Sequence, residues 1–364
     1  MSIGSLTRSM ALLAITALLV ACSGSGASSA PSAEASAAPS AAASEAASAE
    51  PSAAAGGIEV GYLPKDVVNK YFDAAKTGVD KAATELGGAP VTKVGPQAAD
   101  AAAQIPFISD LTTQGVDAII ISAAGPDAVV PALEEAQAAG IKVVGFDAAP
   151  AVGSYDVFVN QVDFSGVGVN LADWACELAP ECTGQIAVLS AAATAENQNQ
   201  WIALMEETLS TDAKFAGLEL VETVYGDDDA TISTTQAQAL LQKYPDLKVI
   251  VAPTTVGILA AAQVVSGAGS DVKVTGLGFP NDMKPFVADG TAPVFGLWSV
   301  PDLGYLSYYV ADLLVKGEIT GAEGETFTVD ALNGGQPYTI GPDNVVILGP
   351  AYRFDSTNVN DFDF

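Results

Sequence analysis

The chain has no histidine, and only 14 of its 364 residues are lysine or arginine, against 43 aspartates and glutamates. Without histidine it can form no histidine-based catalytic triad and no histidine-ligated metal site, and it lacks the usual general base near neutral pH. The formal net charge of -29 argues against nucleic acids and anionic lipid surfaces as partners. These absences favour a binding protein over an enzyme, and we expect neither a metal nor a cofactor.

A hydrophobic run from Met10 to Val20 is too short to span a bilayer, which requires roughly 20 apolar residues. It follows Arg8 and ends in Leu19-Val20-Ala21-Cys22, so residues 1–21 are predicted to be a signal peptide that is removed on export. The last four residues resemble the bacterial lipobox, in which the cysteine is acylated. The alternative is an ordinary secretory signal in which Cys22 is incidental.

Residues 23–57 consist only of serine, alanine, glycine, proline and glutamate. No large apolar side chain is available to offset the entropy of ordering, so residues 22–57 are predicted to be a lipidated cysteine followed by a disordered tether. A flexible coil of this length has an r.m.s. reach of roughly 30 to 35 Å. We therefore expect a monomeric, extracytoplasmic protein that contacts a membrane through its lipid anchor alone.

Cysteine is scarce, with three residues in the chain. If Cys22 carries a lipid, Cys176 and Cys182 are the only pair left in an oxidising compartment. The helix that contains Cys176 should end near Pro180, which lets the chain turn back toward Cys182. We expect a disulfide between them, and two free buried thiols are the alternative.

Residues 58–364 have the length of roughly two domains. Strand-like apolar runs alternate with alanine-rich segments of helical length, which is typical of a parallel α/β fold. The first doubly wound unit is predicted to have strands at Ile58 to Leu63, Val91 to Val94, Ala118 to Ser122 and Lys142 to Phe146, and helices at Asn69 to Leu86, Ala98 to Gln114 and Pro126 to Ala139.

A second unit with the same architecture is predicted to follow, so we expect two Rossmann-like lobes. Its strands are expected at Val157 to Val162, Gln185 to Ser190, Glu219 to Tyr225, Lys248 to Ala252 and Lys273 to Leu277, and its helices at Ser165 to Leu178, Gln198 to Leu209, Thr231 to Lys243 and Val256 to Ser266. The remaining segments should complete the edges of both lobes: Val294 to Trp298, Leu303 to Val315, Thr326 to Val329 and Val345 to Leu348.

Polar and aromatic residues follow several of the predicted strands. In open parallel sheets ligands bind outside the carboxyl ends of the strands, so these residues are candidates for ligand contact. The candidates at strand ends are Lys65, Asp147, Asn160, Gln161, Pro253, Thr254, Thr255 and Trp298.

Lys65 is followed by Tyr71 and Phe72 in the first predicted helix. An ammonium group and two aromatic rings at one strand end suit a polyhydroxylated ring, because the ammonium donates to hydroxyls and the rings face C–H groups. The alternative is that one of the two rings packs in the core. Asp147 could accept hydrogen bonds from two neighbouring hydroxyls or merely close a turn.

The segment Glu196-Asn197-Gln198-Asn199-Gln200-Trp201 carries four consecutive amide side chains. Asn197 could cap the following helix, but four amides exceed what capping needs. Amides both donate and accept, so Asn197 and Gln198 are predicted to contact a neutral polyol. Trp201 is expected in the core. The acidic run Asp227-Asp228-Asp229 is expected to stabilise the N-terminus of the helix that follows it.

Eight short segments carry a resemblance to a known family. They are Leu63-Pro64-Lys65, Gln114-Gly115-Val116-Asp117-Ala118-Ile119, Gly145-Phe146-Asp147, Asn197-Gln198-Asn199-Gln200-Trp201, Tyr244-Pro245-Asp246-Leu247, Ala252-Pro253-Thr254-Thr255, Gly296-Leu297-Trp298 and Asp302-Leu303-Gly304-Tyr305. Together they resemble the type I periplasmic binding protein family, the sugar-binding lipoproteins of ABC importers, over residues 58–364. The resemblance is strongest to the rhamnose-binding branch, with the autoinducer receptor as its relative.

The resemblance implies pocket residues at Lys65, Asp147, Asn197 with Gln198, and Pro253 with Thr255. The autoinducer receptor has aspartate where Asn197 stands and alanine where Thr255 stands, whereas both residues look like the rhamnose branch. We therefore expect capture of L-rhamnose or a related monosaccharide for an ABC permease and its ATPase. An autoinducer receptor, or a receptor for another sugar such as ribose, is the alternative.

The family also implies two lobes joined by a three-crossing hinge that closes on the ligand. The crossings are expected near Ala148 to Gly153, near Trp298 to Pro301 and near Ile340. Residues 58–149 and 300–340 would then form the N-terminal lobe, and residues 150–299 and 341–364 the C-terminal lobe.

Overall fold

The computed structural model describes residues 57–364. The predicted signal peptide, Cys22 and nearly all of the predicted tether therefore lie outside the described residues. Between Gly57 and Phe364 no helix combines the length and the apolar character needed to cross a bilayer.

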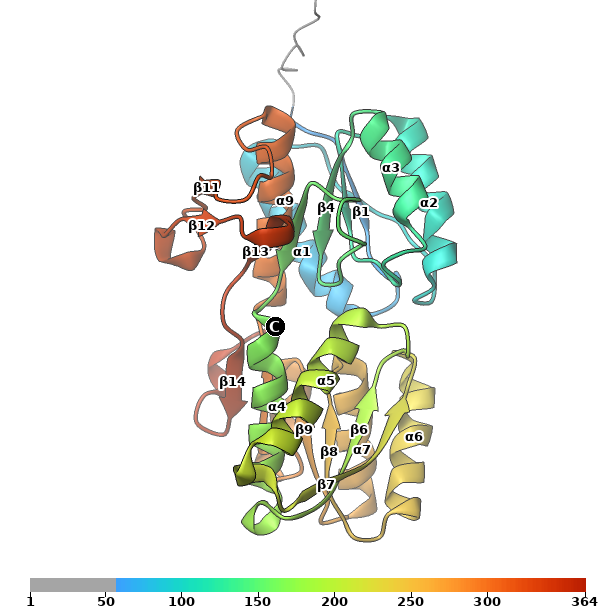
Figure 1. The fold of residues 1–364 in the computed structure, drawn as a ribbon, viewed down its shortest axis with the longest axis vertical. Coiled ribbons are helices and arrows are strands. Elements are labelled where there is room, and N and C mark those ends of the chain that lie inside the picture. Colours follow the sequence, from blue (N-terminus) through green and yellow to red (C-terminus); the bar gives the residue numbers. More distant parts are fainter. Residues whose placement is uncertain (1–56) are drawn as a thin grey trace, which may run out of the picture. The chain divides into compact units, whose positions relative to one another are not determined.

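The first sheet is parallel throughout and has the strand order β13-β5-β4-β3-β1-β2. Helices α1 and α9 pack together on one face, and α2 packs with α3 on the other (Figure 1). The elements are β1 (Val60–Leu63), α1 (Lys70–Leu86), β2 (Thr92–Lys93), α2 (Ala101–Gln114), β3 (Ala118–Ile121), α3 (Val130–Ala138), β4 (Lys142–Phe146), β5 (Val157–Asn160), α9 (Val300–Lys316) and β13 (Val345–Ile347).

The second sheet is also parallel, with the order β7-β6-β8-β9. Helices α4 and α5 pack together on one face and α6 packs with α7 on the other (Figure 1). Its elements are α4 (Phe164–Leu178), β6 (Gly184–Ser190), α5 (Glu196–Thr211), β7 (Leu218–Tyr225), α6 (Ala230–Lys243), β8 (Leu247–Ala252), α7 (Thr255–Ala268), β9 (Lys273–Gly276) and α8 (Pro280–Ala288). The two sheets confirm the predicted α/β class with two doubly wound units.

Two antiparallel pairs complete the described fold: β10 (Val294–Leu297) with β14 (Tyr352–Asp355), and β11 (Thr326–Phe327) with β12 (Tyr338–Thr339). A bridge from Leu277 to Gly296 joins β10 to the end of β9, so β10 and β14 extend the second sheet. The sequence did not predict α8, because it begins at Pro280 and contains Pro285, and proline disfavours helix interiors.

The prediction that Val157 to Val162 opens the second unit is wrong, because β5 pairs in parallel with β4 and with β13. Within residues 57–364 the chain crosses between the sheets after β5, between β10 and α9, and between β13 and β14. The crossing expected near Trp298 to Pro301 is thus found. Those expected near Ala148 to Gly153 and near Ile340 instead lie at 161–163 and 348–351, since β5 and β13 remain in the first sheet.

Helices α1 and α9 approach each other closely enough to exclude any side chain at two positions. A Cβ on Gly78 would lie 1.7 Å from the carbonyl oxygen of Pro301, and a Cβ on Gly304 would lie 1.9 Å from that of Ala75. Backbone atoms cannot move aside as a flexible side chain can, so both positions require glycine. This contact holds α1, whose first turn carries Tyr71 and Phe72, against the sheet.

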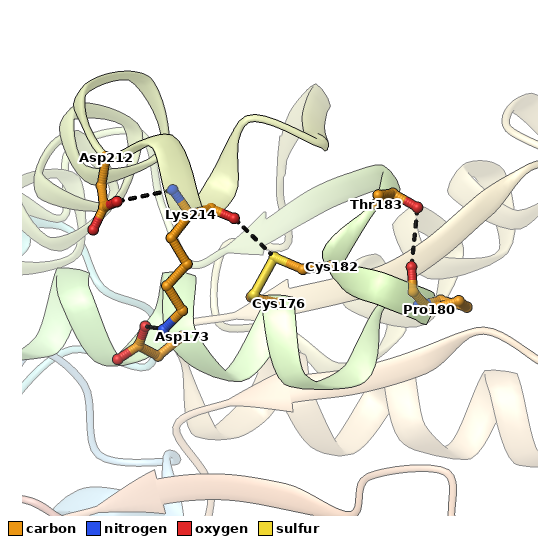
Figure 2. Close-up of a disulfide and its surroundings, with 7 residues drawn as sticks. All are labelled: Asp173, Cys176, Pro180, Cys182, Thr183, Asp212 and Lys214. Atoms are coloured by element: carbon orange, nitrogen blue, oxygen red, sulfur yellow. Dashed lines mark hydrogen bonds and ion pairs between the residues drawn. A yellow bond between two sulfur atoms is a disulfide. The ribbon is translucent and has the colours of Figure 1, made fainter.

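The structure joins Cys176 in α4 to Cys182 by a disulfide with an S–S distance of 2.08 Å (Figure 2). Glu181 and Cys182 both have left-handed backbone angles, with φ of 54° and 55°, in the turn that follows Pro180. Beside the disulfide, Lys214 forms an ion pair with Asp173 of α4 at 2.6 Å. The bond therefore fastens the end of α4 to the beginning of β6, in a turn that strains two non-glycine residues.

Replacing both Cys176 and Cys182 by serine is expected to lower the free energy of unfolding by about 2.4 kcal/mol. The disulfide closes a short loop, and in the chain-entropy model a loop of this length contributes about that much by restricting the unfolded chain. Urea unfolding of the oxidised wild type and the double variant measures the difference. An unchanged midpoint and slope would show that the turn is held by its other contacts.

Candidate ligand-binding site

A cavity of about 40 Å³ lies at the carboxyl ends of strands from both sheets. Ten of the twelve predicted ligand contacts line it. Its walls are formed by Lys65, Asn69, Tyr71, Phe72, Asp147, Asn197, Gln198, Trp201, Asp228, Pro253, Thr254, Thr255, Leu277, Leu297 and Trp298.

Three polar side chains from different elements meet in the cavity. Lys65 follows β1 and its Nζ lies 3.4 Å from Asp147 Oδ2 and 3.4 Å from Asn197 Oδ1, to which it donates. The side chains of Lys65 and Asp147 are each 7% exposed. Because a buried charge is costly unless it is paired, each of these two side chains compensates the burial of the other.

The backbone sets the direction of Asp147. The residue follows β4 in the left-handed conformation, with φ of 59°, which aspartate tolerates better than most residues. Its Oδ2 also accepts a hydrogen bond from Ser122 Oγ at 2.7 Å, at the end of the neighbouring strand β3. Asn197 Nδ2 donates to the carbonyl oxygen of Asp147 at 3.5 Å. The carboxylate is therefore fixed from two sides before any ligand contacts it.

Asn197 does not cap α5. The helix begins at Glu196 with Ala195 as its N-cap, and no side chain provides a capping hydrogen bond there. Both Asn197 and Gln198 are buried, and both line the cavity. The amide-rich segment therefore contributes side chains to the cavity wall and does not cap the helix.

An aromatic wall faces the polar cluster. Trp298 Nε1 donates to the hydroxyl oxygen of Tyr71 at 2.9 Å, and the two rings meet edge to face at 6.4 Å. Burial, together with the negative charge of Asp147, raises the pKa of Tyr71 well above its ordinary value, so its hydroxyl stays neutral. Tyr71 and Phe72 are both buried and both line the cavity, so neither is merely a core residue.

Two buried polar atoms of residues that line the cavity have no hydrogen-bond partner within the described protein: Gln198 Oε1 and Trp201 Nε1. Trp201 is only 2% exposed, as predicted for a core residue. Its ring nevertheless lies 5.7 Å from that of Trp298, and the residue lines the cavity. One free acceptor and one free donor in a buried cavity are what a hydroxyl-bearing ligand would satisfy.

The opposite wall is formed by the turn after β8 and the turn after β7. Thr254 is the N-cap residue of α7, and its Oγ1 donates to Asp228 Oδ1. Loss of water raises the pKa of Asp228, against the opposing effects of the Thr254 hydrogen bond and the charge of Lys65. Asp229 caps α6, as expected for this acidic run, whereas its neighbour Asp228 lines the cavity.

Asn160 and Gln161 do not line the cavity. They stand where β5 passes into the first crossing, and the Asn160 carbonyl oxygen accepts a hydrogen bond from Leu348 N of the third crossing at 2.8 Å. Gln161 is fully buried, and neither of its amide atoms has a partner within the described protein. That both residues contact the ligand stays a prediction.

Five lining residues were not predicted: Asn69, Trp201, Asp228, Leu277 and Leu297. Asn69 caps α1, since its side chain accepts from Tyr71 N, and it lines the cavity as well. Across residues 57–364 no group of acidic or cysteine side chains is arranged to hold a metal ion. The cavity thus offers one cation, two carboxyl groups, amides and aromatic faces.

Comparison with known proteins places this geometry in context. A family model described as a periplasmic binding protein domain matches residues 60–319. An ABC transporter solute binding protein from Clostridium phytofermentas, solved with bound L-rhamnose, is 37% identical with a TM-score of 0.80, over 84% of this chain and 98% of that one. A sugar ABC transporter structure from Actinomyces odontolyticus is 42% identical, with a TM-score of 0.69 and the same coverage of 84% and 98%.

A curated relative is more distant. The ribose import binding protein of Bacillus subtilis is 26% identical over 264 residues, which cover 71% of this chain and 82% of that protein.

Proposed function

The chain belongs to the periplasmic binding protein family, and from that premise we propose that it captures L-rhamnose or a related neutral monosaccharide by hinge closure and delivers it to an ABC permease. The observation that carries the proposal is the paired Lys65 and Asp147 inside a cavity with free amide and indole groups. The relatives are solute-binding proteins, and the proposed function is likewise binding without chemistry.

A neutral ligand fits the charges of the cavity. Lys65 is the one cation among the lining residues of the described cavity, and Asp147 already pairs with it. An anionic ligand such as a sugar phosphate would find no second cation and would face both Asp147 and Asp228. Sugar hydroxyls, by contrast, can donate to Asp147 and Gln198 and accept from Lys65 and Trp201.

A deoxy-hexose is favoured over the alternatives. The aromatic faces of Tyr71, Phe72 and Trp298 suit a ring that carries C–H groups and a methyl group. The rhamnose-bound relative supports this choice at 37% identity, and the ribose import protein supports a pentose at only 26%. Autoinducer capture is the remaining alternative, and the amide of Asn197 and the hydroxyl of Thr255 depart from the residues of that receptor.

Hinge closure follows from the way the walls are divided between the two sheets. We propose that one moving lobe comprises residues 57–160 and 300–347 and the other residues 163–297 and 352–364. Lys65 and Asp147 come from the first lobe and Asn197 from the second, so the contacts of Asn197 with the other two form only when the lobes approach. A lipid on Cys22 and the tether after it would keep the receptor near its permease outside the cytoplasmic membrane.

Calorimetry and thermal shift against L-rhamnose, ribose, galactose and the autoinducer test the proposal. A specific ligand at 100 times its Kd adds about 2.7 kcal/mol to the stability of the folded state. We expect the largest shift with L-rhamnose. A protein that responds to none of the four would refute the proposed sugar capture, and a response to the autoinducer alone would select the alternative.

A further inference from the structure

A groove lies beside the ligand cavity. Its volume is about 370 Å³, and it shares the lining residues Asn69, Asp228 and Thr255 with the cavity. These three residues border both spaces, so a substituent on a captured sugar that extended between them would lie in the groove. With a monosaccharide in the cavity, the groove would still be occupied by water.

Both lobes contribute apolar side chains to the groove. The first lobe supplies Val68, which is 60% exposed, and the second supplies Val256 and Leu259 of α7 together with Phe279. Val68 is held in place because Asp66 Oδ1 accepts hydrogen bonds from Val68 N at 2.9 Å and Asn69 N at 2.7 Å. A ring between these walls would bury apolar surface on both of its faces.

The charges of the groove limit what can occupy it. Asp228, Asp229 and Asp282 line it, against the single cation Lys70. Asp229 is already engaged with the start of α6, where it accepts from Thr231 N and Ile232 N. An anionic substituent such as a phosphate or a uronic acid would be repelled, whereas a neutral ring would not.

We propose that the receptor also captures glycosides of its sugar, with a neutral, apolar-faced substituent on the anomeric oxygen lying in this groove. The proposal rests on the proposed sugar capture, because it places the sugar ring in the cavity between Asp147 and Trp298. It deepens that function by extending the ligand class from free monosaccharides to neutral glycosides.

The test compares ligands on the full chain by calorimetry. The ligands are the monosaccharide that binds the wild type most tightly, its phenyl α- and β-glycosides, and its 1-phosphate. Leu259→Asp places a charge in the groove, and Val264→Asp places the same charge on α7 outside it. We expect one phenyl glycoside to bind at least as tightly as the parent sugar, and the 1-phosphate to bind more weakly.

Leu259→Asp should weaken the phenyl glycoside about tenfold or more and leave the parent sugar within about twofold, whereas Val264→Asp should change neither. Binding of the parent sugar with rejection of both phenyl glycosides would overturn the proposal, as would an equal loss for sugar and glycoside in Leu259→Asp. If none of these ligands binds the wild type, the proposed sugar capture itself fails and the glycoside proposal falls with it.

Discussion

Asp147→Asn is expected to weaken sugar binding at least about a hundredfold while the protein remains folded. The carboxylate is fixed by Ser122 and faces the cavity beside Lys65, so it can accept two hydrogen bonds from neighbouring hydroxyls. Hydrogen bonds to charged groups contribute about 1.5–3 kcal/mol each, and every 1.4 kcal/mol is a factor of ten in Kd. The amide also leaves Lys65 without its counter-charge, which raises the cost of burying that cation.

Asparagine is the appropriate substitution because it keeps the shape of the side chain and tolerates the left-handed backbone, with φ of 59°, at this position. Asp80→Asn is the matched control, since Asp80 pairs with Lys76 on the exposed face of α1, away from the cavity. Isothermal titration of both variants with the preferred sugar gives the two affinities. If Asp147→Asn bound within about threefold of the wild type, Asp147 would not contact the ligand.

Gly304→Ala is expected to lower the free energy of unfolding by at least about 3 kcal/mol, at the upper end of the usual cost of overpacking. The new Cβ would lie 1.9 Å from the carbonyl oxygen and 2.7 Å from the carbonyl carbon of Ala75. No side-chain rotation can relieve a contact with the backbone, so α1 and α9 must separate. Sugar affinity should fall as well, because α1 carries Tyr71 and Phe72 into the cavity.

Gly166→Ala provides the matched control. Gly166 lies in the first turn of α4, is exposed, and has no heavy atom within 4 Å of the position its Cβ would take. Its replacement should leave stability unchanged or raise it by up to about 1 kcal/mol, because alanine favours the helix. Chemical denaturation of both variants measures the two effects. Equal stability of Gly304→Ala and the wild type would mean that the helices separate without cost.

The periodicity of the sequence predicted the two-unit α/β fold because the alternation of strands and helices is a local property. It predicted Lys65, Asp147 and Thr254 in the cavity for a related reason: each follows a strand, and the carboxyl ends of parallel strands meet at one edge of a sheet. These three positions could be predicted without knowing which strands pair with one another.

The prediction that failed depended on long-range pairing. The strand at Val157 to Val162 was assigned to the second unit, but β5 joins the first sheet between β4 and β13, and β13 lies far along the chain. Asp228 was missed because three consecutive acids look like a helix start, although one residue suffices to cap a helix. Backbone angles, such as the φ of 51° at Asp228, decide which of the three aspartates caps the helix and which lines the cavity. The amino-acid composition of the run does not determine these angles.

The last strands of the chain complete both sheets. β13 supplies the edge of the first sheet beside β5, and β14, a few residues later, pairs with β10 at the edge of the second. A chain that is synthesised from its amino end can therefore finish neither half until residues 345–355 have been made. Until then both halves are incomplete and have open strand edges, which is the period in which a chaperone would protect this protein most.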